Sequence, residues 1–213
     1  LLTIDGSGGG TGMSPWNMME TWGVPSIHLH AQAYRYAKVL EAQGEKVVDM
    51  AFAGGLARED HIFKALALGA PFTKLICMGR SLMIPAFLGS NIEGVLRPDN
   101  KEKVFGHWEK LPSSVTEKGT RAEEIFAGYY DVQKIVGANE MGKIPYGAIA
   151  AFTLADKLST GLQQLLAGAR KFNVGAITRD DIFAGNEETA KVTGVPFMLD
   201  VDDEKALAIL KRA

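Results

Sequence analysis

The sequence predicts an α/β fold in which parallel strands alternate with helices, and two glycine turns carry this prediction. The turn Gly54-Gly55 follows an apolar run at 47–53, and the turn Gly79-Arg80 follows a second apolar run at 72–78. Short apolar runs bounded by turn residues are typical of buried strands. The segment between the turns, at about 58–68, has the apolar spacing of a helix. Strand, turn, helix, strand and turn in this order indicate a parallel βαβ unit.

An earlier strand and helix extend this pattern toward the N-terminus. Residues 1–4 form a short apolar run that ends at a cluster of glycines at 6–12, which predicts a strand followed by a loop. A helix is then predicted at about 27–43, where Gly44 ends it. The first part of the chain is therefore predicted to contain three parallel strands joined by helices.

Downstream of the second turn, the sequence predicts helices and one irregular stretch. A short helix at 81–87 is followed by a polar, proline-punctuated stretch at 89–120, which is typical of irregular surface structure. Further helices are predicted at about 121–136, from Pro145 to about 172 with Gly161 as a candidate break, and at 202–212.

The two glycine turns are candidates for a phosphate-binding site. Turns at the same ends of neighbouring parallel strands can direct their backbone N–H groups toward one anion, and glycine leaves room for the phosphate. We therefore predict that Gly54, Gly55 and Gly79 supply amides and that the guanidinium of Arg80 adds positive charge. The alternative is that both are ordinary turns of an α/β protein.

The upstream glycine loop is a second candidate for ligand contact. Gly9, Gly10 and Gly12 allow a close approach of the backbone, and Thr11 offers a hydroxyl donor. A flexible glycine linker is the alternative interpretation. Asp5 lies where the first strand ends, and it can contact a ligand or cap the loop.

Several stretches of the chain resemble the FMN-binding domain of the glutamate synthase family. The segment Ile4-Asp5-Gly6-Ser7-Gly8-Gly9-Gly10-Thr11-Gly12-Met13-Ser14-Pro15 resembles the glycine-rich loop after strand 6 of that domain, and 47–82 resembles its end. The stretches Lys143-Ile144-Pro145-Tyr146-Gly147 and 161–172 resemble the tail of FMN-binding glutamate synthase-like proteins. The resemblance covers most of residues 1–172.

This resemblance implies the C-terminal portion of a (β/α)8 TIM barrel, about strands 6–8, followed by a helical C-terminal extension. It divides the chain into the end of the FMN-binding barrel at 1–90, an excursion with helices packed on the barrel at 91–172, and a helical tail at 173–213. A complete barrel needs about 250 residues. The chain has 213 residues and begins inside a predicted strand, so we expect a fragment of a longer protein.

The same resemblance implies an FMN-dependent oxidoreductase of glutamate biosynthesis. FMN would be bound through Gly9, Gly10, Thr11 and the two glycine turns, and 2-iminoglutarate, formed from 2-oxoglutarate and ammonia, would be reduced to glutamate. No catalytic residue carries over. Many FMN barrels place a carboxylate before the glycine pair, where this chain has Ala53. Because early strands supply much of the flavin site in such barrels, we expect the fragment itself to be inactive.

The implied reaction needs partners. Cys77 is the only cysteine, so we expect no iron–sulfur cluster on this chain and place such a cluster in the parent protein or in a ferredoxin-like electron donor. The expected substrates are small molecules, 2-oxoglutarate with ammonia or a glutamine-derived equivalent, and a second copy is a candidate to complete the barrel. Cys77 itself is predicted to be buried within its strand.

Composition argues against several other classes of function. The net charge is −2, so no basic surface is expected for nucleic acid. Glycine, charge and proline interrupt the apolar runs before they reach membrane-spanning length, and the first residues do not resemble a signal peptide, which predicts a cytoplasmic protein. His28 and His30 lie near a helix start and are interpreted as surface or packing residues, with no metal site expected.

Two alternative functions stay open from the sequence. The first is another FMN-barrel oxidoreductase or isomerase, such as a 2-hydroxyacid oxidase or a type 2 isopentenyl diphosphate isomerase. The second is a non-catalytic module that binds a phosphate ligand, which Ala53 in place of a carboxylate favours.

Overall fold

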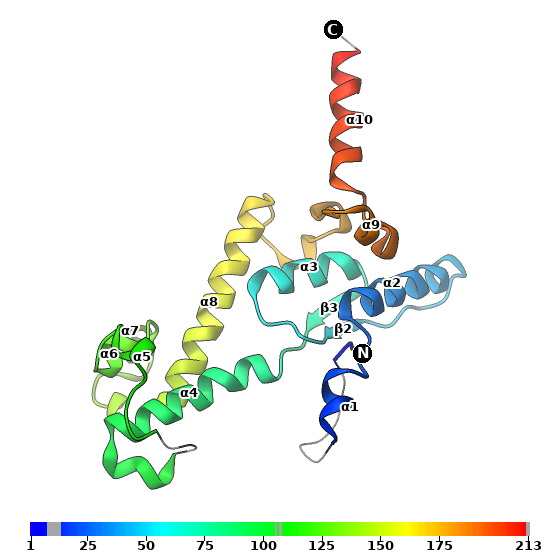
Figure 1. The fold of residues 1–213 in the computed structure, drawn as a ribbon. Coiled ribbons are helices and arrows are strands. Elements are labelled where there is room, and N and C mark those ends of the chain that lie inside the picture. The colour runs from blue at the N-terminus through cyan, green and yellow to red at the C-terminus, as the bar shows by residue number, and fades with distance from the viewer. Residues whose placement is uncertain (8–13, 105, 107, 212–213) are drawn as a thin grey trace. The chain divides into compact units, whose positions relative to one another are not determined.

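The computed structural model describes residues 1–7, 14–104, 106 and 108–211 of the chain. It divides into two compact units (Figure 1). The first unit contains Leu1–Met78 together with Leu162–Ala213, and the second contains Gly79–Gly161. The division into 1–90, 91–172 and 173–213 has different bounds and stays a prediction.

A three-stranded parallel sheet forms the centre of the first unit. Its strands lie in the order β1 (Leu2–Asp5), β2 (Met50–Ala53) and β3 (Thr73–Ile76). The register places Phe52 beside Ile4 on one side and beside Ile76 on the other. The α/β class and the parallel strand order are therefore confirmed, although β2 and β3 are shorter than their apolar runs.

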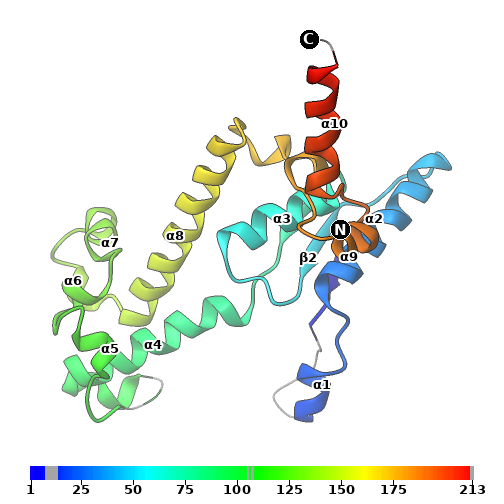
Figure 2. The ribbon, with the colours of Figure 1, turned by 45° about the horizontal axis from the view of Figure 1, so that its top comes forward.

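Helices cover one face of this sheet (Figures 1 and 2). These helices are α2 (Ser26–Ala42) and α3 (Glu59–Gly69), and the short helix α1 (Trp16–Glu20) precedes α2 in the chain. Phe52 of β2 packs with Ala37 of α2 and Ala65 of α3 in one buried cluster. Because side chains alternate along a strand, Ala51 and Ala53 point to the opposite face.

The C-terminal segment belongs to the first unit and packs on α2 and α3. It comprises the end of α8 (Tyr146–Gly168), the 3-10 helices η3 (Val174–Ala176) and η4 (Arg179–Asp181), and the helices α9 (Glu187–Thr193) and α10 (Met198–Leu210). Ile177 is buried against Phe63 of α3. The guanidinium of Arg179 lies 3.9 Å from the ring centroid of Tyr34 and donates a hydrogen bond to the carbonyl of Leu68. These contacts hold the segment against both helices.

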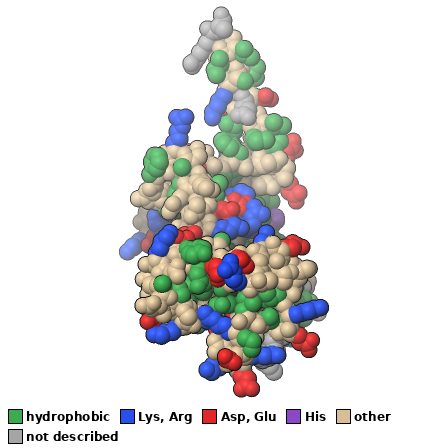
Figure 3. Space-filling model, turned by 90° about the vertical axis from the view of Figure 1, so that its left-hand side faces the viewer, with side chains coloured by type: hydrophobic (Ala, Val, Ile, Leu, Met, Phe, Trp, Pro, Cys, Tyr) green, Lys and Arg blue, Asp and Glu red, His purple; other side chains and the backbone are tan. Residues whose placement is uncertain are grey.

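The second unit is helical. Its elements are α4 (Arg80–Leu96), η1 (Pro98–Lys103), α5 (Ser113–Thr116), α6 (Ala122–Ile125), α7 (Tyr129–Val136), η2 (Met141–Lys143) and the first part of α8. Its core contains Ile92, Phe126, Tyr146 and Ile149. On the face drawn in Figure 3, Lys and Arg side chains lie among Asp and Glu side chains rather than in a patch of one sign.

Helices α4 and α8 approach each other at two glycines. A Cβ on Gly89 would lie 2.4 Å from the carbonyl oxygen of Tyr146, and a Cβ on Gly147 would lie 2.7 Å from that of Ala86. Because the obstructing atoms belong to the backbone, a larger residue would push the helices apart. Gly147, the last residue of the Lys143–Gly147 stretch, therefore has a packing role at the start of α8.

Glu93 and Arg97 form an ion pair at the end of α4, and both residues also make hydrogen bonds to the start of α8. Glu93 is 5% exposed. Its carboxylate accepts hydrogen bonds from the backbone N–H of Tyr146 at 2.8 Å, and from the side chains of Asn100 and Arg97 at 3.2 Å each. Arg97 also donates to the carbonyl of Ile144. The carboxylate thereby caps α8, whose first N–H groups have no acceptor within the helix.

Several predicted elements need correction. Helix α4 extends to Leu96, so the short helix at 81–87 and the irregular structure predicted from 89 onward are wrong there. The segment predicted as one helix at 121–136 forms α6 and α7, because Phe126 turns into the core between them. Helix α8 continues through Gly161, since one glycine costs a helix only about 1 kcal/mol. Cys77 is exposed and not buried, because it follows the last residue of β3.

Candidate anion-binding site at the carboxyl edge of the sheet

The Gly54-Gly55 turn leaves β2 at the carboxyl edge of the sheet. Its residues have φ angles of +113° and +69°, which glycine adopts far more readily than other residues. The backbone N–H of Gly6, just after β1, donates to the carbonyl of Ala53 at 3.2 Å. The turn therefore lies directly beside the loop that follows β1.

Close backbone packing explains why the first position of the turn is glycine. A Cβ on Gly54 would lie 2.4 Å from Ser26 Oγ, 2.7 Å from the nitrogen of Gly6 and 2.9 Å from that of Ser7. A Cβ on Gly55, in contrast, would meet no heavy atom within 4 Å. Gly54 is therefore required by its neighbours and its φ angle, whereas Gly55 is favoured by its φ angle alone.

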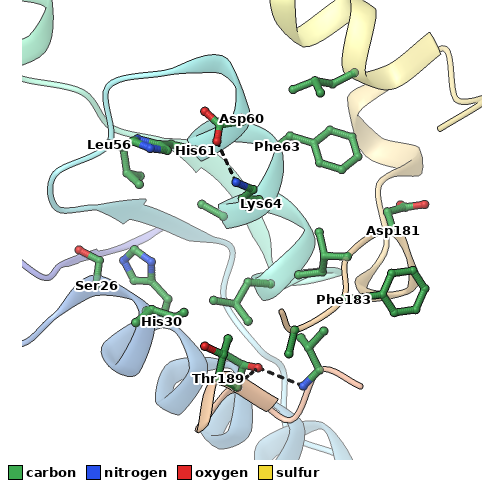
Figure 4. Close-up of a pocket in the computed structure, with 18 residues that line it drawn as sticks. Ser26, His30, Leu56, Asp60, His61, Phe63, Lys64, Asp181, Phe183 and Thr189 are labelled. Carbon is green, nitrogen blue, oxygen red and sulfur yellow. Dashed lines mark hydrogen bonds and ion pairs between the residues drawn. The ribbon is translucent and has the colours of Figure 1, made fainter. Parts of the chain in front are cut away.

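Two side chains from the first turns of α2 hold this glycine turn (Figure 4). Ser26 Oγ donates a hydrogen bond to the carbonyl of Gly54 at 2.6 Å, and His30 Nε2 lies 3.0 Å from the carbonyl oxygen of Ala53. His30 is 2% exposed, and its ring stacks on Phe52 with the centroids 3.9 Å apart. The interpretation of His30 as a packing residue is confirmed. Its hydrogen bond to the turn, like that of Ser26, was not predicted.

The amides of the turn are the groups available to a ligand. Among the residues that the structure describes, no carbonyl or side chain accepts a hydrogen bond from the N–H of Gly54 or of Gly55. Successive backbone N–H groups of this kind form an anion-binding nest. The preceding Ala53 brings only a buried methyl group, so this position adds no polar or charged side chain for an anion.

The second predicted turn begins the other unit. Gly79 precedes α4, and Arg80 is the first residue of that helix, with an exposed side chain. A helix of this length carries a partial positive charge at its N-terminus. The N–H of Cys77, just after β3, donates to the carbonyl of Phe52 at 2.8 Å, so both turns follow neighbouring parallel strands. Convergence of their amides on one anion stays a prediction.

The remaining predicted site residues lie before α1. Asp5 Oδ1 accepts a hydrogen bond from the backbone N–H of Ser7 at 2.9 Å, which is the capping role that the sequence allowed for it. The predicted contacts of Gly9, Gly10 and Thr11 fall outside the described residues and stay predictions.

A cavity of about 480 Å³ lies between α2, α3 and the C-terminal segment (Figure 4). Ser26 and His30 line it together with apolar side chains such as Phe63. Lys64 on its wall is paired with Asp60 at 2.8 Å, and this hydrogen bond lowers the pKa of the Asp60 carboxyl. Because its walls are mainly apolar and its lysine is already paired, the cavity is less suited to phosphate than the glycine turn.

The described residues contain no group of three or more His, Cys, Asp or Glu side chains that could hold a metal ion. His28 is exposed, and His61 Nδ1 accepts a hydrogen bond from the N–H of Ala57 at 3.2 Å. No helix in the described part of the chain is long and apolar enough to span a membrane.

The structure thus has parallel strands with connecting helices, and at their carboxyl edge a glycine turn whose amides have no acceptor among the described residues. This arrangement is typical of α/β proteins that bind anionic ligands at that edge. Residues 1–95 match the family model described as the conserved region in glutamate synthase, which relates this part of the chain to that family. The match relates the chain to oxidoreductases. Searches of curated proteins and of solved structures found no match.

The stability of the first unit is expected to fall as the pH is lowered below 6.5, the usual pKa of histidine. Burial lowers the pKa of His30, and hydrogen bonding to the carbonyl of Ala53 offsets this only in part. The unfolded chain then takes up a proton at a higher pH than the folded chain does, so the free energy of unfolding decreases with falling pH. Urea unfolding on both sides of that pH measures the effect. His30→Gln should lack this decrease, whereas replacement of the exposed His28 by glutamine should retain it, and an equal decrease in both variants would contradict the assignment.

Proposed function

We propose that β1, β2 and β3 correspond to about strands 6–8 of a (β/α)8 TIM barrel, with the later helices as its helical C-terminal extension. The parallel order of the strands and the helices on one face support this assignment. Leu2 of β1 and Leu75 of β3 are about half exposed, at 50% and 51%. Both strands have β2 as their only partner within the described residues, so further strands could pair with each outer edge.

FMN is the ligand whose phosphate this site fits best. The amides of Gly54 and Gly55, which have no acceptor among the described residues, are the observation that carries the proposal. Both N–H groups can donate to phosphate oxygens, and Gly55 brings no side chain between them and the ligand. An amide of Gly79 and the positive charge of Arg80 stay predicted contacts of the phosphate. Gly9, Gly10 and Thr11 are proposed to contact the flavin or the substrate.

The family match supports glutamate synthase chemistry. When bound, FMN would supply the hydride that reduces 2-iminoglutarate, formed from 2-oxoglutarate and ammonia, to glutamate. The part of this chain is to fix the phosphate end through backbone amides, and thereby to orient the cofactor. We assign no catalytic residue, and we expect the chain to be inactive in isolation.

The proposed reaction takes electrons and ammonia from partners. An iron–sulfur cluster in the parent protein or in a ferredoxin-like donor would supply the electrons, and ammonia or a glutamine-derived equivalent would reach the site with 2-oxoglutarate. A second copy of the chain is a candidate for completing the barrel along the outer edges of β1 and β3.

A non-catalytic module for a phosphate ligand is the second candidate function. Ala53 favours it, because this methyl group cannot bind the ribityl hydroxyls as a carboxylate in that position would. Another FMN-barrel oxidoreductase or isomerase shares the phosphate turn with the first candidate. Bleaching of a bound flavin by substrate would separate both enzymes from the module.

The visible spectrum of the purified chain, recorded before and after addition of FMN and desalting, tests the proposal. Flavin bands that stay with the protein are expected. Gly55→Asp and Gly55→Asn form a matched pair, because both side chains tolerate positive φ angles and only Asp brings negative charge. The Asp variant should bind FMN about tenfold more weakly than the Asn variant, since a like charge near the phosphate costs on the order of 1 kcal/mol or more. Equal binding by both variants, or no retention of FMN by either the chain or its full-length parent, would overturn the phosphate site.

A further inference from the structure

The two hydrogen bonds from α2 go to consecutive carbonyls of the glycine turn. His30 Nε2 lies 3.0 Å from the oxygen of Ala53, and Ser26 Oγ lies 2.6 Å from the oxygen of Gly54. Ser26 and His30 are four residues apart and therefore lie on one face of α2. One helix face thus contacts two successive peptide groups of the turn.

Because each carbonyl shares a peptide group with one of the two amides, these contacts also fix the direction in which the N–H groups of Gly54 and Gly55 point. The carbonyl of Ala53 belongs to the same peptide group as the N–H of Gly54, and the carbonyl of Gly54 belongs to that of Gly55. Both peptides are trans. In a planar trans peptide the C=O and N–H bonds point in opposite directions. A donor that holds each carbonyl toward α2 therefore turns each N–H away from α2.

We propose that Ser26 and His30 are positioning residues that aim the amides of Gly54 and Gly55 at the phosphate. This inference rests on the proposed function, because it assigns these residues a role in the same site. Neither side chain touches the ligand in this proposal. Each acts through the carbonyl that it holds.

The surroundings of the two side chains support a positioning role. Ser26 is the first residue of α2, after the N-cap position at Pro25, and its hydroxyl donates to the turn. The His30 ring is fixed by stacking on Phe52 and is almost completely buried. The carbonyl of Ala53 also accepts the N–H of Gly6, so donors approach it from both α2 and the β1 loop. The peptide between Ala53 and Gly54 is held from two sides.

Residual dipolar couplings of the glycine N–H groups test the orientation directly, without any ligand. We expect the coupling of Gly55 to change in Ser26→Ala and that of Gly54 to change in His30→Met. The nearly isosteric His30→Gln keeps a donor for the carbonyl of Ala53 and should retain the wild-type coupling. Couplings that stay at their wild-type values in both Ser26→Ala and His30→Met would overturn the proposal. Unfolding of His30→Met would leave the test to Ser26→Ala, which removes a single oxygen.

Titration with inorganic phosphate, followed by the amide shifts of Gly54 and Gly55, adds the binding readout. Ser26→Ala and His30→Met are each expected to weaken phosphate binding about tenfold, the loss that one hydrogen bond of ordinary net strength would give. His30→Gln should bind phosphate within about threefold of the wild type, because most of that hydrogen bond is kept. Altered couplings with unchanged phosphate affinity would overturn the role in binding. Altered couplings in a chain whose wild type binds neither phosphate nor FMN would overturn the phosphate site and leave the orienting role supported.

Discussion

Replacement of Glu93 by alanine is expected to destabilise the second unit by about 3–5 kcal/mol, the usual cost of removing one partner of a buried ion pair. The change leaves the guanidinium of Arg97 without its carboxylate, although that side chain is only 23% exposed. It also removes the acceptor for the N–H of Tyr146 at the start of α8. Loss of a helix cap and an uncompensated charge therefore act together at one place.

Matched variants separate the buried charge from the cap. Glu93→Gln keeps an oxygen for the N–H of Tyr146 and removes only the charge, so its loss should be intermediate. Glu140→Ala breaks an exposed ion pair with Lys143 in the same unit, and exposed pairs contribute only about 0–1 kcal/mol. Urea unfolding can be followed by fluorescence of Trp108, which packs against the core of this unit, once the exposed Trp16 and Trp22 are replaced by phenylalanine. A loss in Glu93→Ala no larger than in Glu140→Ala would contradict the structural role of this carboxylate.

The strand order could be predicted from the sequence because its signals are local. Each of β2 and β3 is an apolar run followed by a glycine turn, and a helix of the right length lies between them. The break between α6 and α7 has no such signal. Phe126 leaves the helical path to pack edge-on against Tyr146, and a Cβ on Gly128 would lie 2.8 Å from Thr153 Oγ1. Contacts with α8, which lies later in the chain, decide where α6 ends.

The candidate site also combines a part that has a local sequence signal with a part that depends on contacts between residues far apart in the chain. Glycine pairs after strands are visible in the sequence, and so Gly54 and Gly55 could be predicted as a turn with free amides. Ser26 and His30 could not be assigned to that turn, because they precede their partners by 28 and 23 residues. A serine and a histidine near a helix start have many other roles. Only the packing of α2 against the end of β2 brings them to the carbonyls.

Gly54→Ala is expected to destabilise the first unit by about 4 kcal/mol, since a side chain at a positive φ angle and overpacking cost about 1–3 kcal/mol each. The new methyl carbon would lie 2.4 Å from Ser26 Oγ and 2.7 Å from the nitrogen of Gly6. The serine hydroxyl can move aside, but doing so breaks its bond to the turn. The backbone of the β1 loop can yield only by separating from β2.

Gly55→Ala is the control, because it adds the same methyl group to the same turn. At a φ angle of +69° with no atom within 4 Å, alanine should cost only about 1–2 kcal/mol, the penalty for left-handed backbone. Hydrogen exchange of the slowest amides in β2 reports the free energy of unfolding for both variants. A larger loss in Gly54→Ala would tie the stability of the sheet to the contact between the turn, the β1 loop and α2. Equal losses would mean that the backbone angle alone requires glycine at Gly54 and that the packing against Ser26 and Gly6 can relax.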